Sequence, residues 1–225
     1  MTHIIKKLKC YPQGHIHWEN GAYMSMSINN TVFHNEDTLR TVLETISDNC
    51  NSCSIIVGDY LHRYNEELIS EGNLKDVIKK ALDKGRKLVD LFKKVLNNSN
   101  VNTNYTIHYT KDFLSHPQFS EKMDHFQRLH KSNKDFKGLT EYTIEVFLRR
   151  QNNRKVSLEK AKELCRLYLF EELVIFEILA EEGYKVNIYP GNQLPIIKAI
   201  VTGQLKNVSK PLESIQAIEI KFRPK

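Results

Sequence analysis

Short apolar segments alternate along this chain with longer segments whose apolar residues recur every three or four positions. The short segments have the length and composition of buried strands, and the longer ones have the period of an amphipathic helix. The expected strands are 23–28, 54–57, 105–109 and 186–189, with an edge strand at 216–222, and the expected helices are 37–46, 74–96, 120–132, 139–150 and 158–182. Strands that alternate with helices are typical of α/β domains, so the sequence predicts a largely parallel sheet.

The chain has the length and composition of a single domain. Its 225 residues include no repeat and no linker, and hydrophobic residues, 40% of the total, are spread over the whole length. No apolar run approaches the ~20 residues of a membrane-spanning helix. The N-terminal segment mixes charged with apolar residues, unlike a secretory signal. We therefore expect one soluble, cytoplasmic domain over residues 1–225.

Motifs for metal and nucleotide binding are missing from the sequence. Cys50 and Cys53 form one CxxC pair, without the second pair of ligands that a structural zinc site needs. The histidines have no metal-binding spacing, no GxGxxG follows the first expected strand, and no GxxxxGK[ST] occurs. We expect neither a metal nor a cofactor.

Much of the net charge of +6 lies in the helix expected at 74–96. Outside its apolar stripe this helix carries Lys75, Lys79, Lys80, Lys84, Arg86, Lys87, Lys93 and Lys94. A localised basic face is typical of proteins that bind polyanions. A solvated helix face without a partner has the same composition, so both interpretations stay open at this point.

Polar or reactive residues lie at the carboxyl ends of three of the expected strands, at 27–30, 58–60 and 189–190. Ligands of parallel sheets bind beyond the carboxyl ends of the strands, which makes these residues candidates for a site. Ser27 is a possible nucleophile, although no GxSxG elbow surrounds it and turn serines are more often caps. Asp59 can equally be the N-cap of a helix that follows its strand.

A second candidate group lies in the helix expected at 158–182. Tyr168 and Glu172 are four residues apart and share a helix face, with Glu171 at a spacing of three from Tyr168. The following residues are strongly apolar, so this face should lie near the core, where a carboxylate needs a cation such as a substrate ammonium. A surface glutamate paired with lysine or arginine explains the pattern equally well.

Taken together and in order, these segments resemble the cyclodipeptide synthase family over most of the chain. The matching segments are Ser27 with Asn30, Phe33 and 34–37, then 59–63, 141–149, 168–172 and 189–190. The Tyr189-Pro190 pair resembles the signature of the family's XYP branch. Asn30 is more typical of the sister branch, and Ile28 stands where many members have proline.

The resemblance implies a Rossmann-like parallel sheet flanked by helices, similar to the catalytic domain of class I tyrosyl- and tryptophanyl-tRNA synthetases but without ATP use. It implies an aminoacyltransferase that joins the amino acids of two aminoacyl-tRNAs into a 2,5-diketopiperazine. The reaction is ping-pong, through aminoacyl- and dipeptidyl-serine intermediates. We expect a monomer that needs no cofactor, metal or membrane.

The resemblance also implies roles for individual residues. Ser27 is the nucleophile, with Ser25 close enough to compete for that role. Glu172 and Tyr168 hold the substrate ammonium, and Tyr189 lines the site and assists the later steps. The basic helix, Lys75 to Lys94, receives the tRNA acceptor arm.

A substrate pocket is expected around these residues, formed by Tyr23, Ser25, Asn30, Asp59, Glu171, Ile175 and Asn187. Tyr23 and Ser25 share a strand face with Ser27, and Asn187 shares one with Tyr189. This pocket is unusually polar, so the first amino acid is expected to be polar, with histidine as the leading candidate. Two alternatives are an aminoacyl-tRNA-dependent transferase with another acceptor and a non-catalytic tRNA-binding protein, and a zinc-dependent nucleic-acid binder is more remote.

Overall fold

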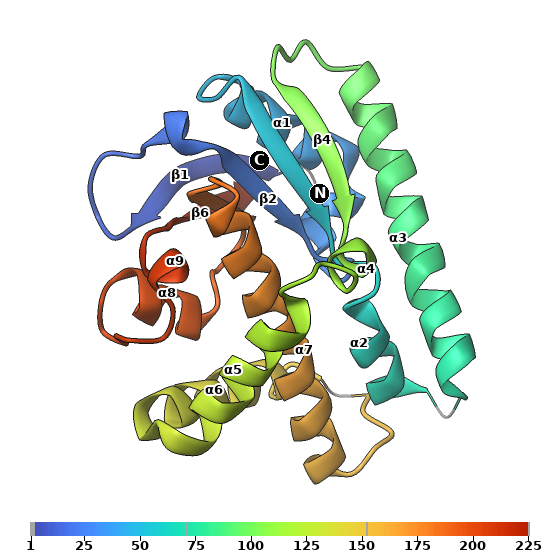
Figure 1. The fold of residues 1–225 in the computed structure, drawn as a ribbon. Helices are drawn as coiled ribbons and strands as arrows, with labels where there is room; N and C mark the ends of the chain where they lie inside the picture. The colour runs from blue at the N-terminus through green and yellow to red at the C-terminus, as the bar shows by residue number, and fades with distance from the viewer. Residues whose placement is uncertain (1–2, 71, 152, 225) are drawn as a thin grey trace.

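The computed structural model describes residues 3–70, 72–151 and 153–224, which form a six-stranded sheet flanked by helices (Figure 1). The strand order is β1-β6-β5-β2-β3-β4. The strands are β1 (His3–Tyr11), β2 (Ala22–Met26), β3 (Ser52–Val57), β4 (Asn104–Tyr109), β5 (Val186–Pro190) and β6 (Gln216–Pro224). Neighbouring strands are parallel except for the antiparallel edge pair β1 and β6. The predicted α/β architecture is confirmed.

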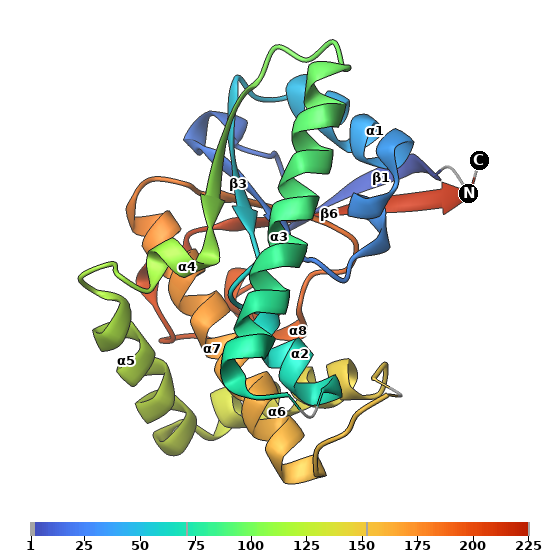
Figure 2. The ribbon, with the colours of Figure 1, turned by 90° about the vertical axis from the view of Figure 1, so that its right-hand side faces the viewer.

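Helices cover both faces of the sheet (Figures 1 and 2). They are α1 (Glu36–Ser47), α2 (His62–Ile69), α3 (Leu74–Asn97), α4 (Thr110–Phe113), α5 (Phe119–Ser132), α6 (Lys134–Leu148), α7 (Leu158–Glu181), α8 (Pro195–Val201) and α9 (Lys210–Glu213), with 3₁₀ turns η1 (Trp18–Asn20) and η2 (Thr31–His34). Helices α1 and α3 pack with Met24 and Met26 of β2. Helices α5 to α9 pack with Tyr23 on the opposite face. Residues of β2 thus alternate between two layers, as the geometry of a strand requires.

Helix α7 runs through the middle of the larger layer (Figure 1). The side chain of Ser157 caps its first turn by accepting from the Lys160 N–H. Helices α2, α5, α6 and α9 all pack against α7, which explains why residues 173–180 are apolar except at one position. The charged residue within that run, Glu177, is paired with Lys122 of α5 at 3.1 Å. α7 is therefore a buried element that can carry side chains into the centre of the molecule.

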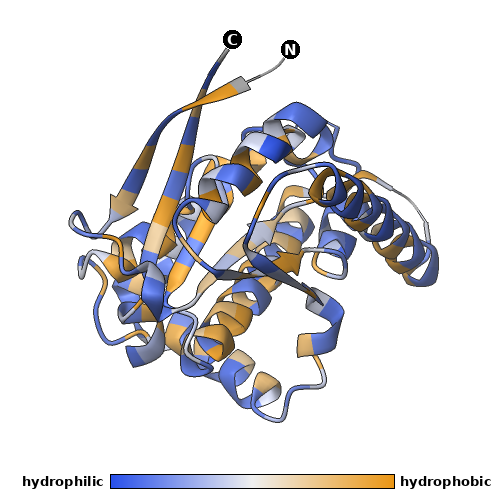
Figure 3. Cartoon of the chain, turned by 90° about the horizontal axis from the view of Figure 1, so that it is seen from above, coloured by the Kyte–Doolittle hydropathy of each residue, from blue (hydrophilic) through white to orange (hydrophobic). Residues whose placement is uncertain are grey.

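Helix α3 is amphipathic and packs along the sheet on the face opposite to α7 (Figure 2). Its buried residues are Val77, Ala81, Gly85, Leu88, Val89, Phe92 and Val95. A Cβ atom at Gly85 would lie 2.4 Å from the Cβ of Asp59, so only glycine allows the helix to approach the turn after β3 so closely. The rest of its surface is largely hydrophilic (Figure 3).

The sequence does not predict β1, because lysines interrupt the apolar residues of its first half. β1 pairs with β6 from the other end of the chain, so β6, expected at an edge, lies between β1 and β5. This pair carries both hydrophilic and hydrophobic residues along its length (Figure 3). The remaining expected elements begin and end within two residues of their predicted bounds, except that α6 starts at Lys134, where Asn133 caps it.

Two details differ at strand ends. β2 stops at Met26, so Ser27 belongs to the following turn, in which the Asn30 N–H donates to the Ser27 carbonyl at 3.0 Å. The expectation that Asp59 caps a helix is wrong, because α2 begins only at His62, with Leu61 in the cap position. A turn at 59–61 separates Asp59 from the helix, and its carboxylate accepts from the Thr110 hydroxyl at 2.9 Å.

Candidate active site

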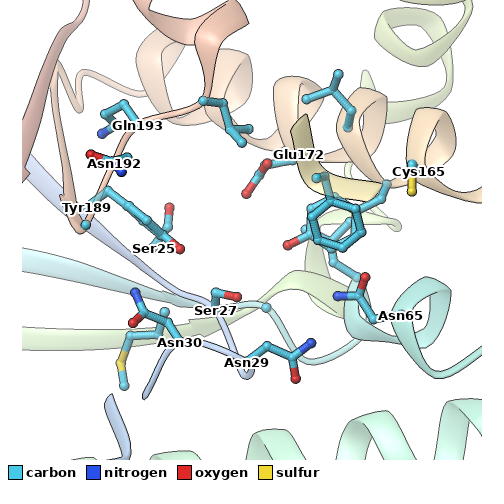
Figure 4. Close-up of a pocket in the computed structure, with 18 of the residues that line it drawn as sticks. Ser25, Ser27, Asn29, Asn30, Asn65, Cys165, Glu172, Tyr189, Asn192 and Gln193 are labelled. Carbon is cyan, nitrogen blue, oxygen red and sulfur yellow. The ribbon is translucent and has the colours of Figure 1, made fainter. Parts of the chain in front are cut away.

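The strand order reverses direction between β2 and β5. From β2 the chain proceeds outward to β3 and β4, and it then returns to form β5 on the other side of β2. The loops that follow β2 and β5 therefore diverge, which leaves a crevice at the carboxyl ends of these two strands. A cavity of about 450 Å³ lies there, lined by both loops and by residues of α2, α6 and α7 (Figure 4).

The cavity brings together most of the residues that the sequence predicts for the site. Those that line it are Ser25, Ser27, Asn30, Tyr168, Glu172, Ile175, Asn187 and Tyr189. Tyr23, Asp59 and Glu171 are buried but are not among the lining residues. Figure 4 shows Glu172 reaching from α7 toward the side of the cavity on which Ser25, Ser27 and Tyr189 lie.

Asn30 joins the two loops that form the crevice. Its Nδ2 donates to the Pro190 carbonyl at 2.7 Å, and its Oδ1 accepts from the Val32 N–H at 3.1 Å. Because one side chain bonds both loops, the spacing between the turn of Ser27 and the end of β5 is fixed.

Tyr189 is the residue of β5 next to Ser27. Burial raises the pKa of the Tyr189 phenol, and the Glu172 carboxylate adds to the rise, whereas side-chain hydrogen bonds with Asn30 and Ser27 oppose it. The phenol therefore stays protonated near neutral pH and is placed to exchange hydrogen bonds with the Ser27 hydroxyl.

Glu172 is the carboxylate that faces this cavity among the described lining residues. The cavity leaves its side chain half-buried, yet its Oε2 is fully covered and has no hydrogen-bond partner within the described chain. Burial raises the pKa of this carboxyl to about 8. Burial and the nearby Glu172 charge together hold the pKa of Tyr168 well above its usual value. A cation entering the cavity would relieve the cost of this unpaired carboxylate.

Glu171, the neighbour of Glu172, is already neutralised inside the protein. Its Oε1 lies 2.5 Å from Arg63 Nη2 and accepts from the Tyr64 hydroxyl at 2.7 Å. The Arg63 guanidinium lies over the rings of Tyr60 and Tyr64, 3.8 and 4.0 Å from their centroids. With Glu171 held in this ion pair, Glu172 is left as the carboxylate available to a cationic ligand.

The deep end of the cavity is unusually polar. Ser25 Oγ and Asn187 Nδ2 are buried, line the cavity and have no hydrogen-bond partner among the described residues. The Tyr23 hydroxyl, beside Asn187 in the register of β2 and β5, is likewise buried without one. Unpaired buried donors and acceptors are uncommon in proteins, and their clustering at a cavity indicates a polar ligand.

Sequence reasoning missed several lining residues, namely Asn65, Arg150, Gln151, Asn192 and Gln193. Asn192 and Gln193 directly follow β5, so the rule for strand ends that selected Ser27 could have found them. Asn65 lies within α2 and Arg150 just beyond α6, and no local pattern marks either position.

Asp59 lies outside the cavity and supports the fold around it. Burial raises the pKa of its carboxyl, while hydrogen bonds with Tyr60, Thr110 and Lys111 oppose the rise. Through Thr110 it connects the turn after β3 to the end of β4, and its Cβ lies against Gly85 of α3.

All eight basic residues predicted on α3 are exposed. Three have acidic partners: Lys84 pairs with Glu66, Arg86 with Asp83, and Lys94 with Glu36. The other five, Lys75, Lys79, Lys80, Lys87 and Lys93, have no ion pair among the described residues. Helix α2 packs against α3 and also lines the cavity, so the helix that carries the basic face lies behind one wall of the site.

None of the helices that the described residues form is long and apolar enough to span a membrane. Within the same residues, no three histidine, cysteine or acidic side chains gather as a potential metal site.

No family model and no curated protein matches this sequence, but solved structures do. A cyclodipeptide synthase from Fluoribacter dumoffii superposes with a TM-score of 0.82 at 19% identity, covering 99% of each chain. One from Candidatus Glomeribacter gigasporarum, bound to Phe-tRNAPhe, gives 0.66 at 16% identity, over 91% of this chain and 88% of that one. A Mycobacterium tuberculosis protein, described as showing that cyclodipeptide synthetases are related to type I tRNA synthetases, gives 0.66 at 13% identity, over 93% and 88%. The chain thus has the fold of the cyclodipeptide synthases.

Proposed function

We propose that this protein is a tRNA-dependent cyclodipeptide synthase that uses two aminoacyl-tRNAs and no ATP. The main observation in support is the cavity at the strand-order reversal, where Ser27 lies across from the unpaired Glu172. This cavity lies in a chain that has the fold of the cyclodipeptide synthases. The Tyr189-Pro190 pair at the end of β5 favours the XYP branch. The direct test is mass spectrometry of the medium of bacteria that express the protein, with a 2,5-diketopiperazine absent from the empty-vector strain as the expected result.

The first step is attack of Ser27 Oγ on the ester carbonyl of the first aminoacyl-tRNA. The bond from the carbonyl carbon to the ribose oxygen breaks, the tRNA leaves with a proton on that oxygen, and the aminoacyl group stays on Ser27 as an ester. The substrate is already an activated ester, so no nucleotide has to be hydrolysed. The Tyr189 phenol, which is near enough to the Ser27 side chain for Ser27 to influence its pKa, is placed to pass the proton.

Glu172 and Tyr168 hold the α-ammonium of the bound aminoacyl group. The carboxylate supplies the charge that the cavity otherwise lacks, and it is the group placed to accept a proton from that ammonium. The ammonium must lose this proton before its nitrogen can act as a nucleophile.

The second step extends the group on Ser27. For the dipeptide to remain on the enzyme, the seryl-bound amine must attack the ester of the second aminoacyl-tRNA, because attack in the other direction would leave the dipeptide on tRNA. The second tRNA then leaves, and the terminal amine of the dipeptide attacks the seryl ester. Ring closure releases the diketopiperazine and regenerates the Ser27 hydroxyl, with Tyr189 beside it.

The basic face of α3 is proposed to bind the tRNA acceptor arm. Changing Lys79, Lys80, Arg86 and Lys87 together to glutamate should weaken tRNA binding strongly and make it less salt-dependent. Every phosphate that the protein no longer neutralises lowers the slope of log affinity against log salt by roughly one unit. Filter binding over a salt series measures both effects, and circular dichroism should show an intact fold because all four side chains are exposed.

A control with the same change in net charge separates a tRNA site from a general charge effect. Arg128, Lys131, Lys134 and Lys137 are exposed residues of α5 and α6, beyond α7 from α3 (Figure 1). Their reversal to glutamate should lower tRNA affinity much less. If tRNA affinity decreased equally in the two variants, the basic face of α3 would be an ordinary solvated surface and not a tRNA site.

The first amino acid is proposed to have a polar or hydrogen-bonding side chain, with histidine as the leading candidate. Ser25, Asn187 and the nearby Tyr23 hydroxyl would stay unpaired against an aliphatic guest, and each unpaired buried group costs about 1–3 kcal/mol. An imidazole can pair with Asn187. Asn187→Leu should move the product profile toward aliphatic cyclodipeptides, and a wild-type profile dominated by cyclo(Leu-Leu) or cyclo(Leu-Phe) would contradict the proposal.

A further inference from the structure

Asn187 and Gln193 form a hydrogen-bonded pair at the polar end of the cavity. Gln193 Nε2 lies 3.2 Å from Asn187 Oδ1, 3.3 Å from the Ile218 carbonyl and 3.5 Å from the Asn187 carbonyl. Both side chains line the cavity and are almost fully buried, with 1% of Asn187 and 6% of Gln193 exposed.

These hydrogen bonds decide which way both amides face. Main-chain carbonyls can only accept, so the amino group of Gln193 must be the atom that faces Ile218 and Asn187. That amino group can only donate, so Asn187 must turn Oδ1 toward it. The Asn187 Nδ2 group is then directed away from Gln193, and it is buried without a partner among the described residues.

The loop that carries Gln193 is itself anchored. The Gln193 N–H donates to Glu219 Oε1 at 2.9 Å, and Glu219 is fully buried in β6. Lys198 lies 2.5 Å from Glu219 Oε1, Lys221 lies 2.7 Å from Oε2, and the Tyr11 hydroxyl donates to Oε2 at 3.3 Å. These bonds hold the Gln193 main chain in place, so that the side chain keeps its position against Asn187.

The neighbours of Asn187 leave its donor free for a ligand. The Tyr23 phenol is near enough for the Asn187 amide to oppose the rise of its pKa on burial, but the two do not form a well-aligned hydrogen bond. The hydroxyls of Tyr23 and Ser25 can either donate or accept, whereas Asn187 Nδ2 can only donate. Asn187 is therefore the group that imposes a requirement on the guest.

We propose that Gln193, anchored by Glu219, is a positioning residue that sets amino-acid specificity by holding Asn187 with its donor toward the pocket. The first aminoacyl group must then carry a hydrogen-bond acceptor in its side chain, such as an imidazole nitrogen, a carboxamide oxygen or a hydroxyl. Aliphatic side chains have no acceptor, and lysine and arginine carry only donors. This inference rests on the proposed function, because it assumes that the cavity receives an aminoacyl group on Ser27.

The test reads the identity of the acyl group on Ser27 directly. Full-length protein is mixed with total tRNA charged with all the amino acids, quenched in acid and analysed by intact mass, and histidyl- and leucyl-tRNA are then put in pairwise competition. Wild type should carry an acceptor-bearing acyl group. Gln193→Leu frees the Asn187 amide to rotate and should lower the preference for histidyl over leucyl by roughly 10- to 100-fold.

A matched control uses a second bridging glutamine. Gln216 Nε2 donates to the His15 carbonyl and its Oε1 accepts from the His17 N–H, in the segment between β1 and β2, and Gln216 is not among the lining residues of the cavity. Gln216→Leu removes a similar set of bonds and should leave the acyl preference unchanged. A general effect of losing a glutamine would move both variants equally.

Asn187→Asp gives a result that loss of structure cannot imitate. An aspartate can still accept from Gln193, but it turns an acceptor instead of a donor toward the pocket. The preference should therefore move toward side chains that donate, with lysyl or arginyl groups appearing on Ser27. Melting temperatures of all variants identify any that fail to fold.

The possible results distinguish the proposed function from the acceptor requirement and from the role of Gln193. If no acyl group of any kind appears on wild-type protein, the proposed function fails. If acyl-enzyme forms but leucyl is preferred over histidyl in wild type, the acceptor requirement is wrong while the function stands. If a folded Gln193→Leu protein keeps the wild-type preference, Gln193 has no positioning role.

Discussion

Ser27→Ala is expected to abolish both the covalent label left by radiolabelled aminoacyl-tRNA and the release of diketopiperazine. Removal of a nucleophile that forms a covalent intermediate typically lowers turnover by about a thousandfold or more. The alanine side chain fits the same half-buried turn, whose Asn30-to-Ser27 hydrogen bond is between main-chain atoms and does not need the hydroxyl. Binding of tRNA should persist, because the basic face of α3 is untouched.

Ser25 provides the matched control for this experiment. It lines the same cavity and lies only two residues earlier, but it is buried within β2, whereas Ser27 follows the strand. Ser25→Ala should keep the label and change only which aminoacyl group is accepted. Loss of label in Ser25→Ala together with its retention in Ser27→Ala would assign the nucleophile to Ser25. Retention in both would exclude a seryl intermediate at either position.

The residues of the site that the sequence could identify are those marked by short-range geometry. Ser27 follows β2 and Tyr189 lies at the carboxyl end of β5, and the carboxyl ends of parallel strands meet at one edge of the sheet. Tyr168 and Glu172 share a helix face because they are four residues apart, and both line the cavity. In each case the residues that define the pattern are only a few positions apart in the sequence, so the period of a strand or helix is enough to relate them.

Long-range pairing is what the sequence could not supply. Helix spacing places both Glu171 and Glu172 near Tyr168, and it does not show that Glu171 is occupied by Arg63, 108 positions away from it in the chain. Similarly, β1 and β6 join the two ends of the described chain, so neither the strand β1 nor the interior position of β6 follows from local pattern. Gln193, which holds the Asn187 side chain, is itself bonded to Ile218 and Glu219, and these belong to a different strand from Asn187.

Burial and access to the cavity are also different properties. Tyr23 and Ser25 share one face of β2, as alternation predicts, but Ser25 lines the cavity and Tyr23 lies behind it. Periodicity assigns a side chain to a face and carries no information on how far a cavity extends into that face.

Glu172→Gln is expected to lower diketopiperazine formation by about two to four orders of magnitude, while tRNA affinity changes little. Removal of one partner from a buried ion pair costs several kcal/mol, because the other charge is left without compensation. Here that other charge is the substrate ammonium, and most of the tRNA affinity arises from the nucleic acid. Single-turnover formation of product and filter binding of tRNA measure the two quantities separately.

Glu171→Gln is the matched comparison, since the same chemical change falls on the adjacent residue. It leaves the buried Arg63 without its partner, so the free energy of unfolding should fall by about 3–5 kcal/mol. An active Glu172→Gln enzyme beside a folded but inactive Glu171→Gln enzyme would transfer the ammonium-binding role to Glu171.

Glu172→Gln should have the opposite effect on stability, and the effect should depend on pH. Burial raises the pKa of the folded Glu172 carboxyl to about 8, whereas its ordinary value is 4.5. Between these values the folded protein binds a proton that the unfolded chain has released, so the free energy of unfolding of the wild type falls as pH rises through this window. Glutamine stays neutral and lacks this decrease. The variant should match wild type near pH 4 and exceed it above pH 8, by about 1–3 kcal/mol for a half-buried carboxyl. Urea denaturation of the substrate-free proteins at several pH values measures the difference. A constant difference across pH would mean that Glu172 titrates alike in the folded and unfolded protein, so that the empty cavity does not raise its pKa.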